Sequence, residues 1–430
     1  MRIRCAHMLA LMIWAAAPSA AQDFTTLKGH GGPVMGIAVA PDGQVVTASF
    51  DNSVGVWTGR DPKWLEAHDA AVNDVAVGPM GPVSVGDDFA VYAWTDDGAR
   101  KLGVHKGKVA DVKVSPDGAL VATASWDGTV GLWDFAGTGT RRDLSVGAVN
   151  DVVFAADGNS LFAAGSSGAI LEIKADGPEK RVLVENGFGV NVLSLAPDMT
   201  WLAYGAVDGV THVIDPDTGD LIADFSLDRR PILAMAHHAG TNQLAVGDGE
   251  GFIMVVDTAE WRITRSFQAT RSGPIWALAY DPTGETIYAG GLDDVVYAWP
   301  VALLDEYDAV ADGERSFLRA VEDMPNGERQ FMRKCSICHA LENGVSRKAG
   351  PTLYHLFGRA AGTVEGYRYS DILDGSDIIW TDETIDRLFD LGPDHYIPGS
   401  KMPMQRITAA QDRADLIEFL KTATKRKEAK

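Results

Sequence analysis

The sequence predicts a two-domain protein: an all-β ring of seven blades, a β-propeller, followed by a small all-α domain. At 430 residues the chain is too long for one ordinary domain. A β-rich unit of about forty residues recurs through residues 22–300, and after Trp299 the apolar residues change to helical spacing. The 46 glycines, more than a tenth of the chain, indicate many tight turns and fit the β-rich part.

Residues 1–21 have the pattern of an export signal. Arg2 and Arg4 supply positive charge, an apolar run over residues 9–17 follows, and small residues then suit cleavage. The alternative is a membrane anchor, which needs about 20 apolar residues, and this run is far shorter. We therefore expect a periplasmic protein with no membrane-spanning segment once the signal is removed.

The formal net charge is −21, and almost all of it falls on residues 22–300. Nucleic-acid binding depends on Lys and Arg neutralising phosphates, so this surface argues against a nucleic-acid partner. Solubility is a simpler explanation of the acidic surface than a specific acidic docking function.

Each repeat closes on a β-strand that ends in an aromatic or β-branched residue, and successive closing residues are 37 to 43 positions apart. The closing residues are Trp57, Trp94, Trp133, Ile173, Ile214, Val256 and Trp299. Turn residues such as Asp127-Gly128 precede each closing strand, and a second turn such as Pro116-Asp117-Gly118 recurs earlier. This pattern predicts about four antiparallel strands per unit.

The seven units predict seven blades, and a misread weak unit would make the number six or eight. Residues 24–27 precede the first unit and would form the outermost strand of the blade that ends at Trp299. The first and last segments would then close the ring in one blade and remove the exposed edges of an open array.

The third unit carries His105, then the run Trp126-Asp127-Gly128 and a closing Trp133. It resembles the WD40 family, in which such a His, turn Asp and closing Trp share a hydrogen-bonded network. The resemblance implies this network for His105, Asp127 and Trp133. The His recurs as His30 and His68, whereas units four to six lack both the His and the Trp.

Little in the repeats indicates chemistry. His237 and His238 lie near a loop, and ordinary loop histidines are a better explanation of them than a metal or cofactor site. Asp and Glu mostly occupy turns, where they cap the backbone. Because propellers host many functions, a rigid docking or spacing platform is the preferred interpretation of residues 22–300.

A connector over residues 301–322, expected to be helical, leads to the second domain at residues 323–430. Its main feature is Cys335-Ser336-Ile337-Cys338-His339. This spacing suits covalent haem attachment, because the two sulfurs form thioethers with the vinyl groups and the adjacent His is placed to ligate the iron. A zinc site or a disulfide is the alternative, but zinc would need two more ligands, and no further Cys follows the signal.

Residues 323–430 resemble the mitochondrial and c2 branch of class I cytochromes c. The loop over residues 396–402 resembles the one that presents the axial methionine, which implies Met402, rather than Met404, as the ligand opposite His339. Gly350-Pro351 matches the segment whose proline carbonyl accepts the His N–H. Two tyrosines and Trp380 match residues that close the propionate edge of the haem. The resemblance implies one covalent haem c, with His339 and Met402 as metal ligands and with cofactor-binding residues Cys335, Cys338, His339, Met402, Pro351, Tyr367, Tyr369 and Trp380.

The same resemblance places a first helix around Gly327 and a last helix over residues 414–421, with Leu416 and Phe419 over Gly327. Phe389 departs from the family, which often has a Tyr beside the axial Met. Basic residues flank the segments expected to frame the exposed haem edge: Arg333, Lys334, Arg347, Lys348, Lys401 and Arg406. Family members use such a basic rim to meet acidic partners, and a merely solvated set is the alternative.

These features predict an exported carrier of single electrons with no catalytic residue of its own. Its partner would be a redox protein, such as a dehydrogenase, an oxidase or a reductase, and the propeller would serve as the docking platform for it. The alternative is a haem-containing subunit of a periplasmic oxidoreductase whose propeller binds substrate or a second cofactor, by analogy with the haem-and-propeller nitrite reductases. A redox-sensing or assembly scaffold is a third interpretation.

Overall fold

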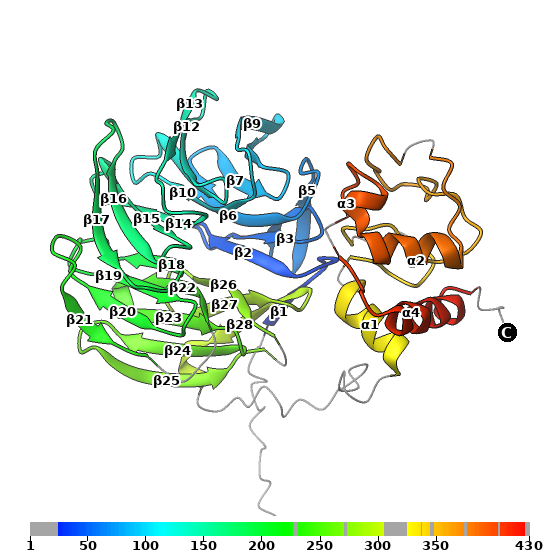
Figure 1. The fold of residues 1–430 in the computed structure, drawn as a ribbon. Helices are drawn as coiled ribbons and strands as arrows, with labels where there is room; N and C mark the ends of the chain where they lie inside the picture. The colour runs from blue at the N-terminus through cyan, green and yellow to red at the C-terminus, as the bar shows by residue number, and fades with distance from the viewer. Residues whose placement is uncertain are drawn as a thin grey trace, which may run out of the picture.

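The computed structural model describes residues 25–226, 231–270, 273–304 and 325–425, apart from 337, 345–347, 374–375, 403–404 and the side chain of Arg333. The predicted signal at 1–21 and most of the predicted connector at 301–322 lie outside the described residues. Figure 1 shows a β-rich ring beside a smaller helical domain.

In the described residues the ring contains seven four-stranded antiparallel sheets. Blades one to three consist of β2 (Val34–Val39), β3 (Val45–Ser49), β4 (Val54–Thr58) and β5 (Asp61–Leu65); β6 (Val72–Gly78), β7 (Gly81–Gly86), β8 (Ala90–Thr95) and β9 (Gly98–Val104); and β10 (Val109–Val114), β11 (Leu120–Ser125), β12 (Thr129–Asp134) and β13 (Gly139–Asp143).

Blades four to six follow the same order along the chain. They consist of β14 (Val149–Phe154), β15 (Ser160–Gly165), β16 (Ala169–Lys174) and β17 (Lys180–Glu185); β18 (Val190–Leu195), β19 (Leu202–Ala206), β20 (Thr211–Ile214) and β21 (Leu221–Asp224); and β22 (Ile232–His238), β23 (Gln243–Asp248), β24 (Phe252–Asp257) and β25 (Arg262–Gln268). Two short 3₁₀ turns are η1 (Ala239–Thr241) and η2 (Val301–Leu303).

The seventh blade joins the two ends of the propeller. It contains β26 (Ile275–Tyr280), β27 (Thr286–Gly291), β28 (Val295–Pro300) and β1 (Thr25–Lys28). Thr25 pairs with Ala298 and Lys28 with Val295. The predicted seven blades and the predicted closure of the ring are therefore confirmed, except that Phe24 lies outside the described residues.

The blades pack against one another through their inner strands. Every residue of β3 and β15 is buried, whereas β13 and β17 at the outside are largely exposed. Small and β-branched residues such as those of β3 suit a strand that is covered on both faces by neighbouring blades.

A buried network in blade three carries the predicted His, Asp and Trp. The His105 Nδ1 lies 3.3 Å from Asp127 Oδ2, and its Nε2 lies 2.8 Å from the Thr123 hydroxyl. Trp133 Nε1 donates to the same hydroxyl at 3.0 Å. The predicted network is confirmed, with Thr123 as a member that the sequence argument missed. His30 and His68 head equivalent networks in blades one and two.

The second domain contains α1 (Asn326–Lys334), α2 (Asp382–Leu391), α3 (Pro393–Tyr396) and α4 (Ala410–Ala423). Helix α1 meets α4 at Gly327, where a Cβ would overlap the backbone oxygen of Asp415 and lie 2.9 Å from Phe419 Cβ. The predicted approach of Phe419 is confirmed, although the backbone of Asp415, rather than Leu416, is the nearest neighbour. Across the described helices, none has both the length and the apolar character needed to cross a bilayer.

Candidate functional site

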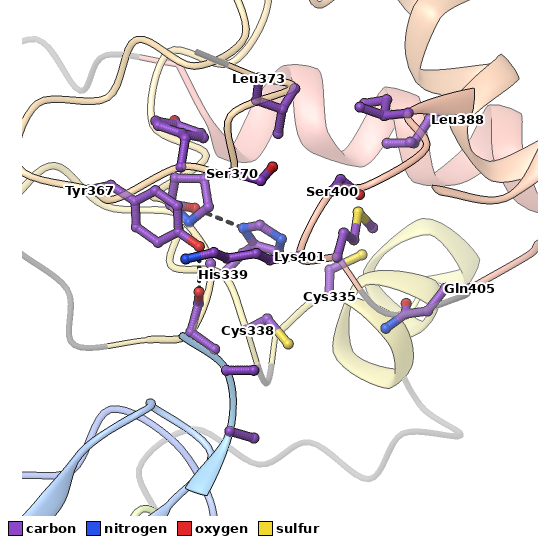
Figure 2. A pocket seen from close by; sticks show the side chains of 18 of the residues that line it. Cys335, Cys338, His339, Tyr367, Ser370, Leu373, Leu388, Ser400, Lys401 and Gln405 are labelled. Carbon is purple, nitrogen blue, oxygen red and sulfur yellow. Dashed lines mark hydrogen bonds between the residues drawn. The ribbon is translucent and has the colours of Figure 1, made fainter. Parts of the chain in front are cut away.

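A cavity of about 680 Å³ lies in the helical domain and is lined by residues of both domains. Its volume is in the range of about 300–1,000 Å³ that is usual for cofactor and small-molecule sites. All eight residues predicted to bind a cofactor line this one cavity. Figure 2 shows the side chains of Cys335, Cys338 and His339 close together in its wall.

The end of α1 positions the two cysteines and the histidine. Cys335 caps α1 by donating its N–H to Phe331 O at 2.8 Å, and the N–H groups of Cys338 and His339 then donate to Cys335 O at 3.1 and 2.9 Å. This tight turn brings both sulfurs and the imidazole to the same cavity. The two thiols are free, and burial raises the pKa of Cys335 to about 12 and that of Cys338 to about 11.

The imidazole of His339 is oriented by a backbone carbonyl. Its Nδ1 donates to Pro351 O at 2.7 Å, which leaves Nε2 as the nitrogen able to bind a metal (Figure 2). Burial lowers the pKa of His339, so the ring stays neutral as a metal ligand must be. Gly350 leaves room for the ring, because a Cβ there would lie only 2.5 Å from His339 Cε1.

The loop after α3 supplies the thioether. Met402 is partly buried in the cavity wall, and the N–H of Ser400, two residues earlier, donates to Ile397 O at 3.0 Å. Phe389 of α2 is buried and lines the same cavity, so the position that departs from the family is apolar here. Met404, the competing ligand candidate, lies outside the described residues.

The predicted aromatic residues form another part of the wall. Tyr367 donates its hydroxyl to Ala349 O at 2.6 Å, and the Tyr369 hydroxyl accepts the N–H of Val364 at 3.3 Å. The two rings meet edge to face at 4.8 Å, and Trp380 lines the cavity with them. These contacts fix the orientation of the two tyrosine rings in the wall.

Three polar atoms in the wall fit a bound group with polar substituents. Ser370 Oγ, Ser400 Oγ and Gln405 Oε1 are buried, and among the described residues they have no hydrogen-bond partner. Buried polar atoms are normally paired, so unpaired ones at a cavity indicate a missing ligand or water. Together with two thiols, an imidazole and a thioether in an apolar cavity, they fit a c-type haem.

Two cavity residues were missed by the sequence argument as site residues. Arg359 donates to Tyr354 O at 2.6 Å and Thr352 O at 2.8 Å, which ties the segment after Pro351 into the wall. Gln405 carries one of the unpaired atoms. The only signal in the sequence is that each lies a few residues from a motif residue.

The other metal candidates have ordinary surroundings. Among the described residues no three His, Cys, Asp or Glu side chains are grouped to hold a metal ion. His237 packs edge-on against Trp201 at 4.7 Å, and His238 contacts Thr241 Oγ1 at 2.8 Å and Pro282 O at 3.2 Å. Both histidines lie at the end of β22, where these contacts hold their rings.

The basic residues near the cavity have different roles. Lys348 donates to Ser336 O at 2.8 Å and so fixes the segment between the cysteines, and Lys334 lines the cavity. Lys401 pairs with the propeller residue Asp69 at 3.3 Å, whereas Arg406 donates to Asp390 O at 2.8 Å at the end of α2. The Arg333 side chain and Arg347 lie outside the described residues.

Comparison with known families matches the two parts of the chain separately. The family described as WD domain, G-beta repeat matches residues 22–58, 99–134 and 261–300, and the cytochrome c family matches residues 325–424.

Individual relatives cover the second domain almost from end to end. Cytochrome c of Sesamum indicum is 43% identical over 104 residues, which are 24% of this chain and 91% of the relative. Cytochrome c of Ginkgo biloba is 41% identical over 102 residues, which are 24% of this chain and 89% of that relative. Cytochrome c of Euglena viridis is 38% identical over 100 residues, which are 23% of this chain and 96% of that relative. With Cys335 and Cys338 inside the matched region, this likeness suggests one covalent haem c and implies haem-based electron transfer.

Proposed function

Because the chain belongs to the cytochrome c family through its C-terminal domain, we propose that it is a periplasmic carrier of single electrons. The observation that carries this function is the convergence of Cys335, Cys338, His339 and Met402 on one cavity of suitable size. A haem bound there would exchange one electron at a time between its ferrous and ferric states.

The side chains of this chain would divide the work of holding the haem. Cys335 and Cys338 would supply the covalent thioether links, and His339 and Met402 would be the protein ligands of the iron. The carbonyl of Pro351 fixes the orientation of the His339 ring and increases the basicity of its other nitrogen. Because His339 and Met402 would both ligate the iron, no position would remain for a substrate, which favours transfer of electrons without bond chemistry.

Features outside the cavity support the proposed location and partner. The charged and apolar pattern of residues 1–21 supports export to the periplasm. A rigid seven-bladed ring tethered to the cytochrome domain would hold a redox protein, such as a dehydrogenase, oxidase or reductase, at high effective concentration. Affinity purification of the full chain from the periplasm identifies that partner, and recovery of no redox protein would count against the platform.

One observation favours the alternative of an oxidoreductase subunit. The propeller has a second cavity of about 360 Å³, lined by Trp201, Trp261, His237 and Asp198 among others. Aromatic walls with a few polar groups are typical of small-molecule sites. A second cofactor or a bound substrate in the purified protein would select this alternative.

Replacement of the axial methionine tests the carrier. In the haem-loaded full chain, Met402→Ala should leave the haem attached through its two cysteine links. It should free the sixth position of the iron, because only the methionine ligand is lost. We expect rapid binding of cyanide or imidazole to the ferric protein and a lower midpoint potential, since His/Met ligation raises the potential. Absorption spectroscopy and a redox titration measure both effects.

Met404→Ala is the matched control and should keep the native spectrum and potential. The carrier proposal fails if the mature protein contains no haem. It also fails if Met402→Ala behaves like the native protein, or if the native protein already binds cyanide as readily as the variant.

A further inference from the structure

One face of the propeller lies against the mouth of the cavity. Its residues come from the connections between blades and from the turns between the second and third strand of a blade, which lie on the same side of a ring of antiparallel strands. We call this surface the mouth face. It contains Asp69, Asp88, Phe89, Lys108 and Trp126.

Ion pairs join the mouth face to the cytochrome domain. The Asp69 carboxylate pairs with Arg368 and, at 3.3 Å, with Lys401, which directly precedes Met402. Asp294, in the turn between β27 and β28, opposes the lowering of the Lys348 pKa that burial causes. One acidic propeller residue thus meets two basic residues of the cytochrome domain.

The position of Asp69 is built into blade two. Its backbone N–H donates to Asp88 Oδ2 at 3.0 Å, and Asp88 is held in turn by His68 Nδ1 at 3.0 Å. His68 is 6% exposed, so the ion-pairing loop is anchored to a buried network rather than left free. A preorganised carboxylate loses little conformational freedom when it pairs.

Two exposed aromatic side chains of the mouth face also line the cavity. Phe89 and Trp126 are 40% and 54% exposed, yet both line the cavity that holds Cys338 and His339. Phe89 has a φ of +66° in the turn between β7 and β8, and Asn52 has a φ of +70° at the equivalent position of blade one, so this left-handed conformation belongs to the turn. Lys108 lies over the Trp126 ring at 4.8 Å and fixes its orientation.

We propose that the mouth face is an internal docking surface for this chain's own cytochrome domain, which covers the cavity mouth until a redox partner competes for the same basic residues. The occupant is the surface around Arg368 and Lys401, selected by charge complementarity with Asp69. The effect on electron transfer rests on the proposed function, whereas the docking is a contact between two parts of the protein that can be measured independently.

Zero-length carbodiimide cross-linking of the haem-loaded full chain, followed by peptide mass spectrometry, tests the contact. We expect an Asp69–Lys401 cross-link that weakens at high salt, because salt screens exposed ion pairs. Absence of any cross-link between the mouth face and the cytochrome domain would overturn the internal docking.

Charge reversal at Asp69 tests the effect of the internal docking on electron transfer. Asp69→Lys should accelerate reduction of the oxidised protein by a neutral hydroquinone about fivefold, since it removes the two ion pairs that hold the mouth face against the cytochrome domain. The matched control is Asp97→Lys, an exposed carboxylate in the turn between β8 and β9 on the opposite side of the ring. Equal rates in the two variants would overturn the docking, whereas a protein without haem would instead count against the proposed function.

Discussion

In each of the first three blades, one buried hydroxyl group lies within hydrogen-bond distance of two polar side chains. Thr123 is fully buried and lies within hydrogen-bond distance of both His105 and Trp133. The burial of His105 lowers the pKa of the imidazole, against the effect of Asp127. Burial alone would raise the pKa of Asp127, but hydrogen bonds from Thr129 and from the Lys106 N–H bring it down to about 2. The blade therefore keeps a neutral ring beside an ionised carboxylate.

Removing that hydroxyl should destabilise the propeller. Thr123→Val preserves the shape of the side chain but leaves Trp133 Nε1 and His105 Nε2 buried without a partner, at a cost of about 1–3 kcal/mol. Denaturant unfolding monitored by tryptophan fluorescence measures the loss. Thr123→Ser keeps the hydroxyl and is the control, and equal losses in both variants would contradict the role of the hydrogen bonds.

At the scale of elements, the haem-binding turn depends on how closely α1 approaches α4. The missing side chain at Gly327 allows the backbone of Asp415 and the Cβ of Phe419 to pack directly on α1, and the Phe331 and Phe419 rings have centroids 5.4 Å apart. Because α1 ends at the cysteine turn, its position determines where Cys335 lies in the cavity. Helix packing and cofactor geometry are coupled here.

A side chain at Gly327 should therefore disturb both stability and haem attachment. Gly327→Val would force α1 and α4 apart, and overpacking of this kind costs about 1–3 kcal/mol. We expect a lower thermal midpoint for the cytochrome domain and a smaller haem content, measured by the haem absorbance per chain. Glu418→Ala, on the exposed face of α4, should change neither quantity. A native-like Gly327→Val would show that the helices tolerate separation.

At the scale of the whole molecule, carboxylates connect one blade to the next. Asp74 of β6 accepts the N–H of Val112 on β10, and Asp151 of β14 accepts the N–H of Leu193 on β18. Lys113 is the cation that lies between Asp74 and its neighbour Asp111. These contacts fix the angle between blades, and they place carboxyl groups where water is scarce.

The ring should consequently respond to pH. Burial, together with the neighbouring Asp111, raises the pKa of Asp74 to about 7, although Lys113 opposes the shift. A carboxyl group that holds its proton more tightly in the folded state contributes stability at low pH, and this contribution is lost between about pH 4 and about pH 7. Asp74→Asn cannot ionise and still accepts a hydrogen bond.

We expect the stability of Asp74→Asn relative to the native protein to increase as the pH rises from about 4 to about 8. Thermal unfolding of the propeller across this range measures the difference. Asp97→Asn, at an exposed turn, should follow the native curve. A constant difference at all pH values would mean that Asp74 does not titrate in this window.

The sequence by itself determined the features that depend on neighbours along the chain. The period of strands and turns predicted seven blades and the closure of the ring. The Cys335–His339 spacing predicted a covalent haem site, because residues so close in sequence lie within one turn of the chain and can contact the same group. Tertiary structure alone decided what depends on distant segments. Thr123 lies 18 residues from His105, and Asp69 meets Arg368 and Lys401 about three hundred residues away. No local pattern marks such pairs, because burial and charge complementarity arise only when blades and domains pack together.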